Sequence, residues 1–480
     1  MVATLTPQRI TIAQPKVLLV DPHACTDQSD ALAVLRAVFD TLVRRGLNGE
    51  WLPAAARSWT VSADARTYTF DLRSDLVFHD GTVLDAAAVE FSLQRMARPD
   101  MGATLGAGGV YSQYMVGLAV ECLSQWQVAV RLPEPVADFF DLLAYGHLVS
   151  PSAMAAAGDD LAQRLVGSGP WRVTKIEDGV AIDAEAFAHP WRSAGGATHV
   201  RWQATPKCTD RTDLIVQHQV EIATRLSSDP LGHGVAVRTN RDPMAVVFLF
   251  NCSRGPLTDP RVRLALNLAI DRRALIKQVL QGHGQPLHGF VSPAHFGSPP
   301  EGEAALQLPF ELDRARRLLS AAGYAKGLQL DVDRPERLPD EAAALTDAVA
   351  RQLAHVGITF RVHVESDRTH YANRVRLKDI HDMALFDSSP LSTFRVLVEK
   401  IDSRFRGSWW QGYANPEVER LLDEARRTVN EASRRRIYNT AFVQLQLDPP
   451  WLYLYIHTRA TGFTAAASAW SIAIDDVLEP

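Results

Sequence analysis

The chain has 480 residues, of which 46% are hydrophobic and 22% are charged, and its formal net charge is −5. This composition is typical of a globular protein and excludes disordered, collagen-like and coiled-coil classes. At about 100–200 residues per domain, the length predicts two to four domains. Because both signs of charge are spread along the chain with no basic patch, we expect no nucleic acid partner.

The apolar pattern of the first half predicts mainly strands. The predicted strands cover residues 10–20, 66–73, 127–132, 172–182 and 198–205, and the predicted helices cover residues 29–44, 85–96 and 136–145. Residues 66–73 give the clearest pattern, because Tyr68, Phe70 and Leu72 alternate with polar residues as they do in a half-buried strand.

From about residue 241 onward, strands and helices alternate. The predicted strands cover residues 245–251, 328–332, 359–364, 382–386 and 451–457, and the predicted helices cover residues 260–280, 311–322, 340–356, 371–375, 416–428 and 433–448. Such alternation indicates parallel strands joined by helical crossovers. The sequence therefore predicts a β-rich first half and an α/β second half.

No catalytic or cofactor motif accompanies these elements. Val166 occupies the first glycine position of a nucleophile elbow, and neither a phosphate loop nor a dinucleotide fingerprint occurs. His283 and His288 come nearest to a pair of metal ligands, and solvated loop histidines are the alternative. We therefore expect no enzymatic activity, no cofactor and no bound metal.

The cysteines and the N-terminus bear on the cellular compartment. The cysteines lie tens of residues apart, which fits no zinc or C-x-x-C motif and leaves both buried thiols and one long-range disulfide open. They are Cys25, Cys122, Cys208 and Cys252. The start MVATLTPQRITIAQPK lacks the basic residues and apolar run of a signal peptide. We expect either a cytosolic protein or a mature exported chain.

Four segments carry distinctive patterns in order along the chain. Residues 17–96 contain LLVDPH, RTYTFDLR and FHDGT, and residues 166–173 read VGSGPWRV. Residues 250–273 read FNCSRGPLTDPRVRLALNLAIDRR, and residues 413–455 contain YANPEVERLLDEA and PPWLYLY. Together these segments resemble the extracytoplasmic solute-binding proteins of ABC importers, in the peptide/nickel-binding family 5. We expect Arg261 and Arg263 to anchor a helix to neighbouring carbonyls or acids rather than to touch a ligand.

The resemblance implies an α/β fold like that of the periplasmic binding proteins of class C. Such a fold has mixed sheets in two lobes that are joined by a hinge, and an extra β-rich domain. Lobe I would comprise residues 1–46, 166–243 and 456–480, with the extra domain at residues 47–165. Lobe II would comprise residues 244–455.

The implied function is that of the substrate-binding component of an ABC importer. It would capture a peptide or peptide-like solute in the cleft between the lobes and deliver it to a membrane permease with its ATPase. The protein would be a periplasmic monomer from which the signal peptide has been removed. A nickel or other metal chelate and an opine-type conjugate are alternative solutes, and a cytosolic ligand sensor is an alternative function.

The resemblance also points to ligand-binding residues in the second half. In peptide-binding relatives, an aspartate of a W-x-x-D segment pairs with the amino terminus of the peptide. The corresponding segment ALFDSSPLSTF lacks the tryptophan but offers Asp387, with Ser388 and Ser389 as hydroxyl donors. Alternatively, Asp387 caps a turn with these serines. Arg368 lies where some relatives hold a carboxylate-binding arginine, and a solvated arginine at a helix start is the alternative.

Four residues of the first half complete the predicted site. Tyr111 and Tyr114 follow a glycine-rich stretch, and we expect them to form an aromatic wall of the cleft. Thr26 and Asp27 follow the first strand, at the usual cleft edge of such a fold.

Overall fold

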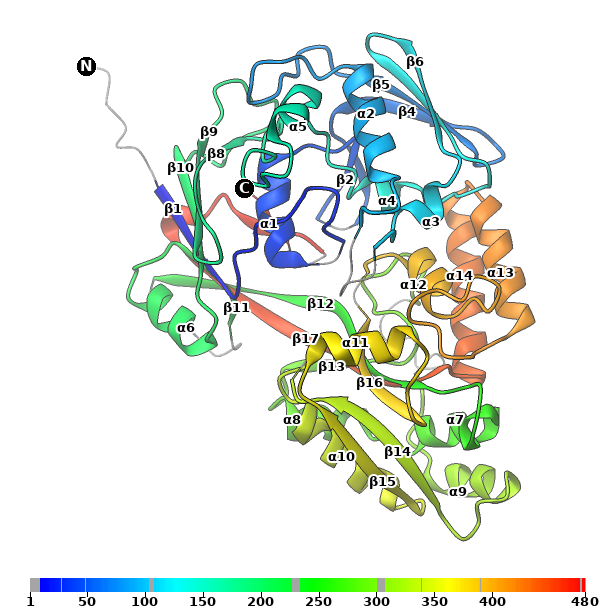
Figure 1. Cartoon of the computed structure of the whole chain (residues 1–480). Helices are drawn as coiled ribbons and strands as arrows, with labels where there is room; N and C mark the ends of the chain where they lie inside the picture. The colour runs from blue at the N-terminus through cyan, green and yellow to red at the C-terminus, as the bar shows by residue number, and fades with distance from the viewer. Residues whose placement is uncertain are drawn as a thin grey trace. The chain divides into compact units, whose positions relative to one another are not determined.

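The chain folds into two compact units in the computed structural model, which describes residues 9–26, 28–47, 49–102, 108–226, 234–299, 307–337, 339–388, 390–474 and 477–479 (Figure 1). Unit 1 comprises Met1–Asn240 and Arg459–Pro480, and unit 2 comprises Arg241–Thr458. The chain therefore passes between the units twice. Both passages lie inside long strands, β12 (Val235–Phe250) and β17 (Trp451–Thr464).

Unit 1 combines a mixed sheet with a smaller β-rich part. Its described elements are β1 (Arg9–Gln14), α1 (Ser29–Val38), β2 (Val43–Arg45), β3 (Trp51–Pro53), β4 (Ala56–Val61), β5 (Thr67–Leu72), α2 (Ala86–Met96), α3 (Ser112–Met115), β6 (Ala119–Ser124), β7 (Gln127–Arg131), α4 (Phe140–Leu143), α5 (Pro151–Ala157), β8 (Trp171–Glu177), β9 (Ala181–Ala186), β10 (His199–Ala204), α6 (Cys208–Val216), β11 (Ile222–Leu226), β18 (Ser471–Ile472) and β19 (Leu478–Glu479).

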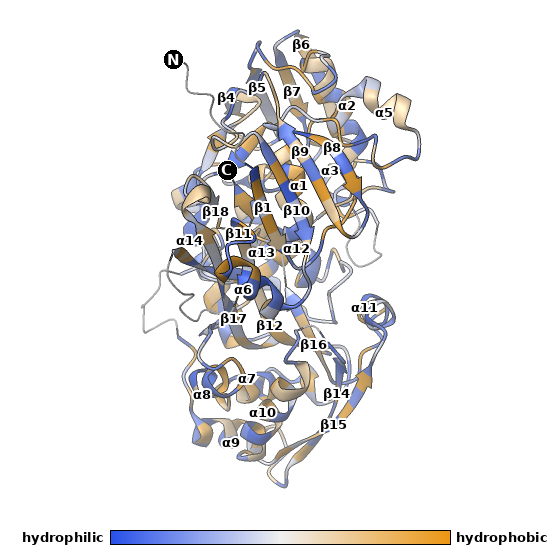
Figure 2. Ribbon diagram, turned by 90° about the vertical axis from the view of Figure 1, so that its left-hand side faces the viewer, coloured by the Kyte–Doolittle hydropathy of each residue, from blue (hydrophilic) through white to orange (hydrophobic). Residues whose placement is uncertain are grey.

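The main sheet of unit 1 is built around β1, the first strand of the chain. β1 lies parallel to both β10 and β11, while β9 runs antiparallel to β10 and to β8. Ile10 and Ile12 of β1 are fully buried. Val200 and Trp202 of β10 are buried while His199 is exposed, as expected for a strand with one face on the core (Figure 2).

The β-rich part of unit 1 is an antiparallel sheet of order β4-β5-β7-β6. Tyr68, Phe70 and Leu72 on β5 are buried, which confirms the predicted alternation. Helix α2 packs on β6 and β7, and the side chain of Asp85 caps it by accepting a hydrogen bond from the Ala88 N–H at 3.1 Å.

Unit 2 is an α/β layer structure. Its described elements, besides parts of β12 and β17, are α7 (Pro260–Leu268), α8 (Arg272–Val279), β13 (Gly284–Pro286), α9 (Leu312–Ala321), β14 (Leu328–Pro335), α10 (Ala342–Ala354), β15 (Ile358–Glu365), α11 (Arg368–Arg376), β16 (Met383–Ser388), α12 (Thr393–Lys400), α13 (Pro416–Arg427) and α14 (Glu431–Leu447). β14 lies parallel to β15 and β16, which confirms the predicted crossovers. β12 runs antiparallel to β16. Apolar residues of α7 and α10 pack on β12 and β14 in one buried core.

Several predicted elements are wrong in extent. The predicted strand over 10–20 ends at Gln14, and the predicted helix over 136–145 is only the short α4. The predicted helix over 29–44 ends at Val38, because Phe39 is extended and β2 pairs with β3 just beyond it. The predicted helix over 260–280 is two helices, α7 and α8. Asp271 separates them, since its carboxylate accepts a hydrogen bond from the Ala274 N–H at 2.9 Å and so starts a new helix.

The structure also bears on the predicted role of Arg263 and on the state of the four cysteines. Arg263 donates hydrogen bonds to the carbonyls of Leu257 and Pro449, which confirms its anchoring role. All four cysteines are free thiols. In the described part of the chain, no helix has the length and apolar character that a membrane crossing requires.

Candidate functional site

The carboxyl ends of β14, β15 and β16 form one edge of the unit 2 sheet. In open α/β sheets, ligands bind beyond the carboxyl ends of the parallel strands, because the loops and helix starts there are free to vary. Asp387 and Ser388 are the last two residues of β16, and Asp387 pairs with Val246 of β12. The predicted acid therefore lies at the edge where this architecture places ligands.

Helix α11 brings a cation to the same edge. Asp367 caps α11 by accepting hydrogen bonds from the Thr369 and His370 N–H groups at 2.8 and 3.0 Å, so Arg368 becomes the first helical residue. The Tyr371 hydroxyl donates to the Leu385 carbonyl at 2.7 Å and fixes the helix against β16. Burial raises the pKa of Tyr371 well above its ordinary value, so this hydroxyl stays a donor.

Arg368 and Asp387 form an ion pair at this edge. Arg368 Nη2 donates to Asp387 Oδ1 at 3.3 Å, and the two side chains are 22% and 16% exposed. The Nε and Nη1 atoms of Arg368 are shielded from water and have no hydrogen-bond partner among the described residues. Since buried donors are nearly always satisfied, these two N–H-bearing atoms need an acceptor from elsewhere. Arg368 is thus a partly exposed arginine at the start of α11, with one ion-pair partner among the described residues.

Ser388 binds a second cation that the sequence did not reveal. Lys400 Nζ donates to Ser388 Oγ at 2.8 Å, and Lys400 is only 3% exposed. Lys400 ends α12, all eight residues of which are buried. The sequence does not distinguish Lys400 from a solvated lysine. Its segment has polar residues at several positions, as a surface helix would.

The remaining predicted residues belong to unit 1 or lie outside the described residues. Thr26 and Tyr111 are buried, and the Tyr111 hydroxyl donates to the Cys25 carbonyl at 2.8 Å, next to Thr26. Tyr114 is half-buried. Asp27 and Ser389 fall outside the described residues. The structure thus brings together Arg368, Asp387 and Ser388 within unit 2, and it places Tyr111 beside the segment after β1 within unit 1.

A buried charge cluster holds that segment of unit 1 in place. The Asp21 carboxylate accepts hydrogen bonds from Arg95 Nη1 at 2.8 Å and from Arg164 Nη1 at 2.9 Å. Burial alone would raise the pKa of Asp21, but the hydrogen bond and charge of Arg95 outweigh it and lower the pKa to about 2. Burial lowers the pKa of His23 to about 4, so this histidine is neutral at neutral pH.

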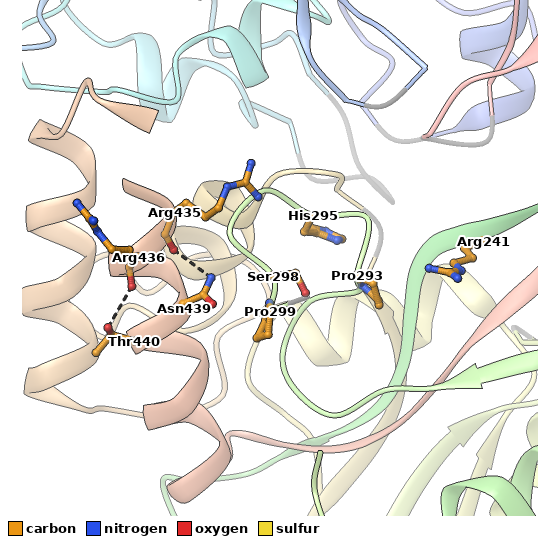
Figure 3. Close-up of a pocket in the computed structure, with 9 residues that line it drawn as sticks. All are labelled: Arg241, Pro293, His295, Ser298, Pro299, Arg435, Arg436, Asn439 and Thr440. Carbon is orange, nitrogen blue, oxygen red and sulfur yellow. Dashed lines mark hydrogen bonds between the residues drawn. The ribbon is translucent and has the colours of Figure 1, made fainter. Parts of the chain in front are cut away.

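Unit 2 also contains a hollow that includes none of the predicted residues. It has a volume of about 700 Å³ and lies between the loop 293–299 and helix α14 (Figure 3). Its lining residues are Arg241, Pro293, His295, Ser298, Pro299, Arg435, Arg436, Asn439 and Thr440. Across the described ranges, no group of three or more His, Cys, Asp or Glu side chains is arranged to hold a metal ion.

Comparison with known proteins identifies the family. The sequence pattern of the bacterial extracellular solute-binding proteins, family 5 middle, matches residues 50–393. The chain belongs to this family. The predicted recognition and fold class are thereby confirmed, and the molecule is a solute-binding protein.

Three similar proteins are each at most 24% identical to this solute-binding protein. It is 24% identical over 461 residues to the glutathione-binding protein GsiB of Pectobacterium atrosepticum, over 91% of this chain and 86% of that protein. Its fold matches DppA of Helicobacter pylori in complex with the peptide STSA, with a TM-score of 0.77 and 21% identity over 98% and 96% of the two chains. It also matches NikZ of Campylobacter jejuni in complex with Ni(L-His), with a TM-score of 0.76 and 19% identity over 96% and 95% of the chains.

Proposed function

We propose that this solute-binding protein captures a peptide or peptide-like solute outside the cytoplasmic membrane and delivers it to the permease and ATPase of an ABC importer. The solute carries an ammonium group and a carboxylate group. The observation that carries the proposal is the Arg368–Asp387 pair at the carboxyl edge of the unit 2 sheet. The protein acts as a periplasmic monomer.

The chemistry of the pair suits such a solute. Arg368 has two shielded nitrogen atoms without a partner in the described part of the chain, and a solute carboxylate would accept hydrogen bonds from them. Asp387 uses one oxygen in a 3.3 Å contact with Arg368, which leaves lone pairs for an ammonium group. Glutathione and the peptide STSA, which the names of two similar proteins mention, both combine these groups.

The first experiment identifies the class of solute. Native mass spectrometry of the purified protein would detect a retained solute, and thermal-shift measurements would compare dipeptides, glutathione, nickel–histidine and an opine. We expect the midpoint of unfolding to rise by several degrees with peptides or glutathione, because a ligand that binds only the folded state stabilises it. A rise in this midpoint with nickel–histidine or the opine alone would contradict a peptide solute. It would indicate a metal chelate or an opine-type conjugate instead.

The second experiment tests the two residues. Asp387→Asn should weaken peptide binding by about 1.5–3 kcal/mol, the value of a hydrogen bond to a charged group, and Arg368→Gln should do the same. Acetylation of the peptide amine should remove the effect of Asp387→Asn, since the partner of Asp387 is then gone. Asp347→Asn, at an exposed position on α10, is the matched control. Unchanged affinity in both site variants would contradict the proposal.

A further inference from the structure

One wall of the hollow beside α14 is the loop 293–299, which is hydrogen-bonded to the segment that follows β16. In the loop 293–299, His295 is buried, and its Nε2 atom lies 2.9 Å from the Pro390 carbonyl. The Thr393 hydroxyl donates to the Phe296 carbonyl at 2.5 Å. Pro390 follows Ser388 by two residues, so the hollow adjoins the carboxyl edge that carries Asp387.

The same loop is fixed to α14 on its other side. Asn439 Nδ2 donates to the Gly297 carbonyl at 2.6 Å. A Cβ atom on Gly297 would lie 2.5 Å from Tyr438 Cβ, and φ of Gly297 is +76°, so the contact requires glycine. The Phe296 ring meets the Tyr438 ring edge to face at a centroid distance of 6.1 Å. The hollow is therefore preformed by packing.

All the charged residues that line the hollow are positively charged. Arg241, Arg435 and Arg436 line it, and no carboxylate does. The Arg435 guanidinium lies 4.6 Å from the centroid of the Phe296 ring, which orients it. Within the described residues, neither Arg435 nor Arg436 forms an ion pair with a carboxylate. Figure 3 shows Arg435 and Arg241 on opposite sides of the loop that carries His295.

We infer that this hollow receives an acidic group of the bound solute, a carboxylate or a phosphate, which the solute carries in addition to the groups at Arg368 and Asp387. Guanidinium groups stay charged at all physiological pH values and match the geometry of such anions. The inference rests on the proposed function, and it narrows the solute to acidic peptides or conjugates. Arg435 is its main ligand, because the ring of Phe296 already holds its guanidinium in place.

Calorimetric titration with matched peptides tests the inference. The probes are Ala-Ala-Glu, Ala-Ala-phosphoserine and Ala-Ala-Gln, so that carboxylate, phosphate and neutral amide are compared on one backbone. We expect the acidic peptides to bind about five- to tenfold more tightly than the amide, as befits a partly exposed charge-assisted contact. The tighter of the two acidic peptides identifies the anion.

Variants separate this site from the one at Asp387. Arg435→Gln should bring the ratio of the affinities for the acidic and amide peptides near one, mainly through weaker binding of the acidic peptides. Arg420→Gln on α13, where the arginine is already paired with Glu417 and Glu424, should keep the ratio. Circular dichroism melting would verify that both variants fold. Equal affinities in the unaltered protein, or a ratio that survives Arg435→Gln, would overturn this inference alone. Binding of none of the three peptides would overturn the proposed function as well.

Discussion

Arg263 should be a principal anchor of unit 2, and its replacement by alanine tests this directly. Arg263 is 4% exposed, and it donates to the carbonyls of Pro449, Leu257 and Thr258 at 3.0, 2.8 and 3.0 Å. It also pairs with Asp448. Removing the guanidinium leaves several acceptors without a donor and leaves Asp448 without its cation. Breaking a buried pair costs about 3–5 kcal/mol, so we expect Arg263→Ala to lower the free energy of unfolding by that amount.

Arg261 provides a matched control two residues away. Its side chain is 50% exposed, and it pairs with Asp259 at 2.6 Å on the surface. Exposed ion pairs contribute little to stability, so Arg261→Ala should have a small effect. Urea unfolding followed by tryptophan fluorescence and circular dichroism would give both free energies. Similar losses in the two variants, or a loss below about 1 kcal/mol for Arg263→Ala, would refute this account of the buried hydrogen bonds.

Two further predictions concern unit 1. Because the pKa of Asp21 falls from 3.8 to about 2 on folding, its ionised form contributes about 2–3 kcal/mol above pH 4, and this is lost as the pH falls toward 2. Acid unfolding curves of Asp21→Asn should lack this component, and an unchanged acid transition would contradict it. A Cβ on Gly167 would lie 2.1 Å from the Val38 carbonyl oxygen, so Gly167→Ala should cost about 1–3 kcal/mol in thermal melts. Gly179→Ala, with open space around it and φ of +69°, should cost about 1 kcal/mol, and equal effects would count against the packing argument.

Hydrophobic periodicity could predict most helices and strands, but not the boundary between two successive helices. The alternation of Tyr68, Phe70 and Leu72 identified β5, because one face of that strand is buried and the other is not. The apolar residues on both sides of Asp271 follow one helical pattern, yet the chain makes two helices there. Local spacing carries no information on where the chain turns, which depends on what each helix packs against.

The sequence by itself determined the family, the α/β order of the second half, and the choice of Asp387 and Arg368 as candidates. Only the tertiary structure decided that these two side chains meet, since they are 19 residues apart and come together because β15 and β16 lie in one sheet with α11 above their ends. It also revealed Lys400 and the arginine-lined hollow. Charged residues are ordinary in sequence, and their burial, their partners and the shape around them arise only when distant segments pack together.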